Sequence, residues 1–166
     1  MYENISEFLN DWSRESQATL KVLSAISDES LCQKVYNDGR TLGDIAWHIV
    51  DSVGEMAGGV GVKLKRPEEN SPVPSSAEEI TALYQSNAVE LLKQIEETWQ
   101  DSNLTEEVDM YGETWTKGLV LHIVIRHEIH HRGQLTILMR QAGLKVPGVY
   151  GPAKEEWADM NMQAPR

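Results

Sequence analysis

Three histidines have the side chains and the spacing of a metal site. His127 and His131 lie four residues apart in the segment HEIHHR. Because a helix turns about 100° per residue, two residues at this spacing project from one face, one turn apart. His48 lies in an earlier apolar segment, so helix packing can bring it opposite the other two. Three neutral imidazoles predict a site for a divalent ion with one coordination position open to water or substrate, as in catalytic zinc sites.

Polar residues near His127 and His131 are expected to have other roles. His122 lies about 140° around the helix from His127, so we expect a core or interface residue rather than a ligand. His130 suits a hydrogen bond to a ligand or a packing role. Gln134, one turn beyond His131, faces either the same cavity or solvent.

Acidic residues near His48 have two interpretations each. Asp44, one turn earlier, either orients the imidazole or is a favourable charge at a helix start. Asp51 and Glu55 either provide a fourth ligand or are solvated helix charges. A fourth protein ligand would indicate a closed, structural site, whereas an open position would indicate catalysis.

The same segment also matches H-E-x-x-H, the motif of zinc metallopeptidases, in which the glutamate is the general base. Glu155 or Glu156 would be the third ligand of such a hydrolase. This hypothesis leaves His48 without a role on a separate helix. On the three-histidine interpretation, Glu128 points about 100° away from His127 and is expected to be a surface or interface charge.

Four amphipathic segments are expected to form the helices that position these side chains, because apolar residues recur in them at helical spacing. Gly133, inside the last segment, suggests a close approach by another helix, since glycine otherwise costs about 1 kcal/mol relative to alanine there. The residues expected at helix ends are Thr41, Ser75 or Ser76, Thr116 and Gly143. The predicted helices cover residues 2–26, 41–57, 75–99 and 119–141.

The segments between these helices indicate the fold. Residues 63–74 form a polar, proline-containing connection that is long for neighbouring helices, so it could be a crossover instead of a tight turn. Residues 101–114 are expected to form a small hairpin or an extended loop. We therefore predict an all-α four-helix bundle in a single domain over residues 1–166.

Composition excludes several classes of function. The net charge of −11, with no basic cluster, argues against nucleic-acid binding. One cysteine, Cys32, excludes an intrachain disulfide and fits a reducing cytosol. The first residues do not resemble a secretory signal, and the longest apolar run, residues 119–125, is too short to span a membrane. We expect a soluble, cytoplasmic protein with no membrane partner.

Taken together, residues 41–48 (TLGDIAWH), 127–135 (HEIHHRGQL) and 147–151 (PGVYG) resemble the DinB/YfiT-like metalloenzyme family. The resemblance covers essentially the whole chain. It implies a four-helix bundle in up-down-down-up order, in agreement with the long connection before the third helix. It also implies a divalent metal held at His48, His127 and His131, and a homodimer. The family name records induction by DNA damage, a stress response, and implies no DNA binding.

The activity implied by the resemblance is transfer or isomerisation with a low-molecular-weight thiol such as bacillithiol, mycothiol or glutathione. The metal would lower the pKa of a thiol or water. Zinc, nickel and iron all accept imidazole, so the metal is not assigned. The alternative from another class is a non-catalytic metal-binding structural dimer. Trp47 and Trp115 either pack in the core or wall a pocket beside the metal.

Overall fold

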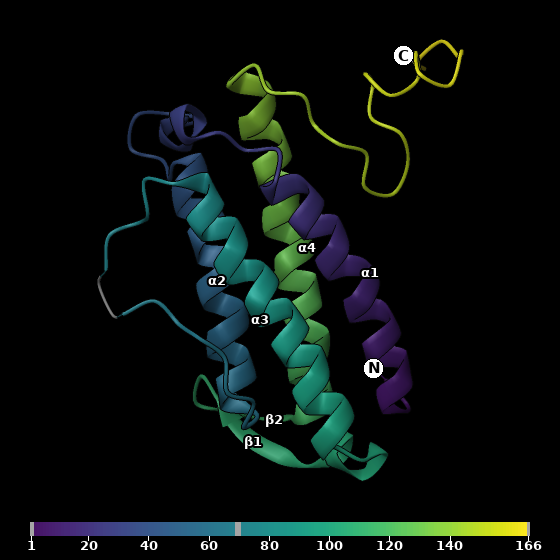
Figure 1. Ribbon diagram of the computed structural model, residues 1–166. Helices are drawn as coiled ribbons and strands as arrows, with labels where there is room; N and C mark the ends of the chain where they lie inside the picture. The colour runs from purple at the N-terminus through teal and green to yellow at the C-terminus, as the bar shows by residue number, and fades with distance from the viewer. Residues whose placement is uncertain (1, 69–70, 166) are drawn as a thin grey trace.

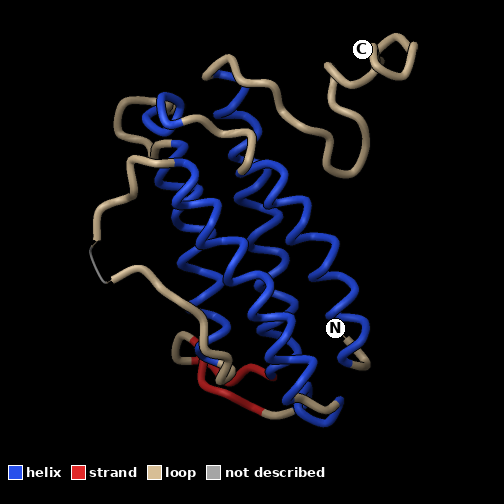
Figure 2. The backbone as a smooth tube through the Cα atoms, viewed as in Figure 1, coloured by secondary structure: helices blue, strands red, loops and turns tan. Residues whose placement is uncertain are grey.

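The computed structural model describes residues 2–68 and 71–165 and is predominantly helical, as expected. Four long helices lie side by side along the described chain (Figure 1), with a two-stranded hairpin at one end (Figure 2). The helices are α1 (Ile5–Leu23), α2 (Leu42–Gly59), α3 (Ala77–Thr98) and α4 (Lys117–Gln141). Two short 3-10 helices precede α2 and follow α3, at Asp28–Cys32 and Asp101–Thr105.

The helix ends follow local chemistry. The Thr41 hydroxyl accepts from the Asp44 backbone N–H, while the Asp44 carboxylate accepts from the Thr41 backbone N–H at 2.7 Å. This reciprocal cap satisfies two donors at the start of α2. Ser76 and Thr116 cap α3 and α4, and Gly143 follows α4 with a φ of 76°, as expected.

Helix α1 is shorter than the predicted span of residues 2–26. Asn4 caps its start by accepting from the Glu7 backbone N–H. The helix ends at Leu23, where the next backbone N–H groups turn back to carbonyls of the last helical turn. Apolar side chains of α1 face the core, and Phe8 and Trp12 are both fully buried.

The core lies between the four helices in two clusters. Trp12, Leu91 and Val124 belong to one, and Ile49, Tyr84 and Leu135 to the other. A buried polar bond also joins the helices, because the Trp12 indole N–H donates to the Ala88 carbonyl of α3 at 2.9 Å. Packing of α2 against α4 places their facing side chains at the site.

The hairpin pairs β1 (Glu107–Met110) with β2 (Glu113–Thr116) in antiparallel register. Tyr111 and Gly112 form its turn with φ values of 57° and 79°, the positive values that a tight two-residue turn requires. Of the two expectations for residues 101–114, the structure therefore shows the hairpin. Trp115 donates its indole N–H to Glu113 and packs against Tyr111, so this tryptophan belongs to the hairpin.

Residues 60–68, the first part of the connection from α2 to α3, contact both helices. The Asn87 side chain exchanges hydrogen bonds with the Lys65 backbone, at 3.1 and 2.8 Å. Arg66 donates two hydrogen bonds to Asp51 of α2, at 3.1 and 2.9 Å. These contacts place the Arg66 side chain beside the middle of α2, near Asp51 and Gly54.

The predicted close approach at Gly133 is wrong. A methyl group at Gly133 would have no neighbouring atom within 4 Å, and Gly133 lies on the exposed face of α4. The packed faces of α4 are instead turned toward α1 and α2. Within the described residues, no helix is long and apolar enough to cross a membrane.

Candidate metal centre

The structure brings the three predicted histidines together. His48 of α2 faces His127 and His131 of α4, and one nitrogen atom from each ring lies within 4.8 Å of the other two. The Nε2 atoms of His48 and His127 are 3.0 Å apart. For comparison, two nitrogens bound tetrahedrally at zinc distances would lie about 3.4 Å apart. The group therefore fits a divalent ion with small side-chain adjustments, and it could hold one.

Gln134 orients His131 within this group. Its side-chain oxygen lies 2.8 Å from His131 Nδ1, and its amide nitrogen lies 3.1 Å from Nε2 of His130. An amide oxygen can only accept, so with this amide orientation His131 Nδ1 carries the proton and Nε2 keeps its lone pair for the site. The exposed Gln134 thus links His130 to the group. The His130 ring bonds Gln134 and packs edge-on against His131, in agreement with the predicted packing role.

The environment keeps the three imidazoles neutral. Burial is the main reason why the pKa of each of the three lies below its ordinary value, and it lowers the pKa of His127 to about 4. Neighbouring imidazoles and the positive charge of Arg40 act in the same direction. At neutral pH the rings therefore carry lone pairs, which is the form that binds metal ions.

The acidic residues near His48 are used elsewhere. Asp44 caps α2, which was one of its two predicted roles, and Asp51 pairs with Arg66 at 2.9 Å. Glu55 is exposed and is not part of the group. Among the described residues, the potential ligands thus comprise three imidazoles and no carboxylate.

The expectation that Glu128 is a surface or interface charge is wrong. Glu128 is only 1% exposed, and its carboxylate accepts from the Thr19 hydroxyl at 2.7 Å. This glutamate faces α1, away from the histidines, so it is not placed to act as the base of an H-E-x-x-H hydrolase. The proposed third ligands of that motif are also engaged, since Glu155 pairs with Arg140 and Glu156 accepts from the Gly148 and Ala153 backbone.

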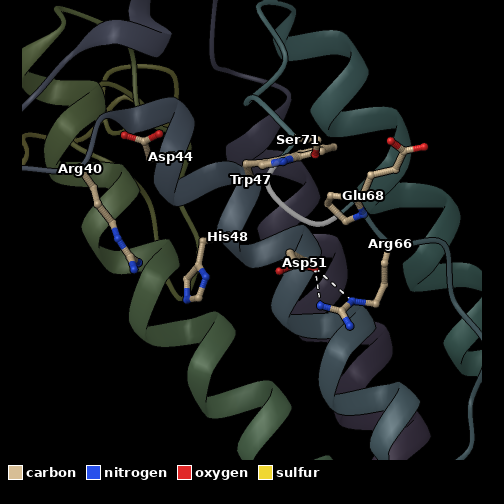
Figure 3. Close-up of a pocket in the computed structure, with 9 residues that line it drawn as sticks. Arg40, Asp44, Trp47, His48, Asp51, Arg66, Glu68 and Ser71 are labelled. Carbon is tan, nitrogen blue, oxygen red and sulfur yellow. Dashed lines mark hydrogen bonds and ion pairs between the residues drawn. The ribbon is translucent and has the colours of Figure 1, made fainter.

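A cavity of about 720 Å³ adjoins His48 on the outer side of α2 (Figure 3). Trp47 lines it, in agreement with one prediction for this residue. Arg40 and Arg66, which the sequence did not single out, contribute positive charge, and Arg40 extends in the same direction as His48 (Figure 3). In the sequence, the only signal for Arg40 was its position directly before the cap of α2.

His122 lies outside the group, as predicted. Its ring packs edge-on against Tyr2, with ring centroids 5.8 Å apart, near the start of α1. The ring is partly buried there. It is therefore a packing residue and a useful control for the other histidines.

Comparison with known proteins agrees with this architecture. The model of the DinB family matches residues 1–166. The chain is 41% identical over 166 residues to Uncharacterized protein YrdA of Bacillus subtilis (strain 168), with 100% of this chain and 99% of that protein covered. A crystal structure of a DinB-like protein from Bacillus cereus ATCC 10987 shares 40% identity and a TM-score of 0.86, over 90% of this chain and 100% of that chain.

A second solved structure, a DinB-like protein (YjoA) of Bacillus subtilis, is 22% identical with a TM-score of 0.68, over 86% of this chain and 96% of that chain. At this identity the likeness concerns the fold. The family match and the 41% identity extend over the full length of the chain. The chain therefore belongs to the DinB family.

Proposed function

We propose that this chain binds one divalent metal ion through His48, His127 and His131 and is an enzyme that acts with a low-molecular-weight thiol. The observation that carries the proposal is the convergence of three neutral imidazoles beside a cavity, without a carboxylate among the described residues of the group. A bound divalent ion lowers the pKa of a thiol or water and so supplies a nucleophile at neutral pH. Zinc, nickel and iron are the candidate ions.

The surrounding residues would position the reactants. Gln134 holds the His131 ring with Nε2 toward the group. Arg40, which lines the cavity, adds a positive charge that favours an anionic reactant beside the histidines. Trp47 provides an apolar wall of the same cavity.

Metal content tests the first half of the proposal. Untagged wild type and the variants His48→Ala, His131→Ala and His122→Ala would be purified without chelator and measured by elemental analysis. We expect about one metal ion per chain in wild type and in His122→Ala, and loss in the other two while their circular dichroism is unchanged. Retention of the ion in folded His48→Ala would contradict the three-histidine site.

Thiol binding tests the second half and separates an enzyme from a non-catalytic structural dimer. With cobalt in place of the native ion, a thiolate that binds the metal adds an absorption band. We expect this band on addition of a small thiol to wild type. A cobalt spectrum that does not respond to any thiol would favour the structural alternative, whose site is closed.

The finer architecture belongs to the same proposal. We infer a single-domain four-helix bundle in up-down-down-up order, supported by the bonds of Asp101 to the start of α1 and of Asp28 to the start of α3. We also propose a cytoplasmic homodimer, in which the exposed Cys32 stays reduced. Sedimentation velocity would test the dimer.

A further inference from the structure

A second cavity, of about 460 Å³, lies on the other side of the histidine group. Arg40 and Gln134 are among the residues that line it. We call it the apolar pocket and define it by the six side chains that give it its character: Val35, Tyr36, Ile45, His131, Ile137 and Leu138.

The apolar pocket differs in chemistry from the cavity beside His48. Ile45 and Leu138 are buried at its base, whereas Val35, Tyr36 and Ile137 are 60%, 67% and 57% exposed around them. Val35 and Tyr36 come from the loop before α2 and Ile137 comes from α4, and all three side chains line the same pocket. The cavity beside His48 is lined mainly by charged side chains instead.

The histidine group lies between these two cavities. His48 lines the charged one and His131 lines the apolar pocket, while Arg40 lines both. A molecule whose reacting atom lies at the histidines would therefore have a charged surface on one side and an apolar surface on the other. Large apolar side chains left in water gain free energy when a ligand covers them.

We propose that the apolar pocket binds an aryl or branched alkyl group of the substrate whose reacting atom lies at the histidine group. This inference rests on the proposed metal centre and adds the chemical class of the group bound beside it. The volume of the apolar pocket is within the range of about 300–1,000 Å³ typical of small-molecule sites. Three exposed side chains are few for a dimer interface, which needs about 800 Å² from each partner.

Two hydroxamates test the inference, because they bind a metal through the same head and differ in the group attached to it. Acetohydroxamate carries a methyl group and benzohydroxamate a phenyl ring. Their Kd values would be measured by visible titration of cobalt-loaded wild type, Val35→Ser, Ile137→Ser and Val89→Ser. Val89 is the matched control, since it is an apolar side chain 64% exposed on α3, and it lines neither cavity.

We expect wild type and Val89→Ser to prefer benzohydroxamate by about tenfold, as an apolar pocket allows. Val35→Ser and Ile137→Ser should each lower this preference by about threefold or more while acetohydroxamate binding is unchanged. If the ratio of the two Kd values is the same in all four cobalt-loaded proteins, the proposed role of the apolar pocket is wrong. The proposed metal centre would not be contradicted by that result. Failure of wild type to bind cobalt would instead overturn the proposed function itself.

Sedimentation velocity on the same proteins addresses the rival occupant, a second copy of the chain. If Ile137→Ser converts a dimer to a monomer without changing the hydroxamate preference, the surface is an interface and the inference is wrong. A changed preference at unchanged mass supports it.

Discussion

Two pairs of polar side chains on α4 have the same spacing and opposite environments. His127 and His131 face α2 beside cavities, and their ring nitrogens contact mainly each other, His48 and Gln134. Glu128 and Arg132, one residue further along, are 1% and 2% exposed. Their partners come from α1 and from the chain after α4.

The two pairs differ in the partners that the protein supplies. Among the described residues, Glu128 Oε1 accepts from Thr19 while Oε2 has no hydrogen-bond partner, so Arg132 is the fully bonded member of the buried pair. The Arg132 guanidinium donates to the Glu15 carboxylate at 2.5 Å, to the Glu15 carbonyl at 2.9 Å, to Thr19 at 3.0 Å and to the Tyr150 hydroxyl at 2.5 Å. The ring nitrogens of His48 and His127 instead face each other at 3.0 Å, and among the described residues the three-imidazole group contains no carboxylate. Spacing alone therefore does not identify a binding pair. The chemistry of the neighbouring groups separates the two pairs: Arg132 is held by bonds to α1 and Tyr150, whereas His127 and His131 converge with a third imidazole.

The largest expected effect tests the structural pair. Arg132→Met should lower the free energy of unfolding by about 3 kcal/mol or more, because it leaves the partly buried Glu15 carboxylate without its cation and removes the bonds to Thr19 and Tyr150. Urea denaturation of the metal-free protein would measure it. Arg140→Met is the control, since this exposed arginine of α4 pairs with Glu155 at the surface and should change stability by less than about 1 kcal/mol. If Arg132→Met and Arg140→Met lower the free energy of unfolding equally, the buried arginine contributes no more to stability than the surface one.

The two pairs should also respond to pH in opposite directions. Burial raises the pKa of Glu128 to about 7, so the folded state holds a proton that the unfolded state releases, and stability falls as pH rises from about 4.5 to 7. Burial lowers the pKa of His127 to about 4, so stability falls as pH drops from about 6.5 to 4.

Urea midpoints of the metal-free protein between pH 4 and 8 would separate these contributions. Glu128→Gln should remove the loss at higher pH. His127→Gln should reduce the loss at lower pH without abolishing it, because burial also lowers the pKa of His48 and His131. Identical profiles for wild type and both variants would show that neither group is linked to folding.

The histidine pair could be predicted from the sequence because its signal is local. A four-residue spacing on an amphipathic helix fixes the shared face of His127 and His131, and the apolar neighbours of His48 turn it inward. The caps at Thr41, Ser76 and Thr116 are local for the same reason. Such features depend on a few consecutive residues.

The buried pair could not be predicted in this way, because its partners are distant. Thr19 and Glu15 lie 109 and 117 residues before Glu128 and Arg132. One signal was present, since Ser16 interrupts the apolar stripe of α1 near these residues and is itself buried. The two cavities could not be predicted either, because Arg40 and Arg66 lie in the loops before and after α2. The positions of these loops are not set by local sequence.

A smaller effect tests Gln134, the hydrogen-bond partner of His131. Gln134→Leu keeps the size of the side chain but removes the acceptor for His131 Nδ1 and the contact to His130. Metal affinity should fall about tenfold, the usual scale for loss of a group that orients a ligand. Competition with a chromophoric chelator would measure it. Gln141→Leu, also on α4 and exposed, is the control and should keep full affinity.

The smallest effect concerns the helix that carries both pairs. Gly133→Ala should stabilise the protein by about 1 kcal/mol, because the site is helical, exposed and has no neighbour within 4 Å of the added methyl group. Metal affinity should not change, since the substituted face points away from both pairs. Thermal unfolding and the chelator competition would be measured together. A gain in stability with a loss of metal affinity would mean that the histidine face, unlike the buried pair, needs a flexible backbone at this point of α4.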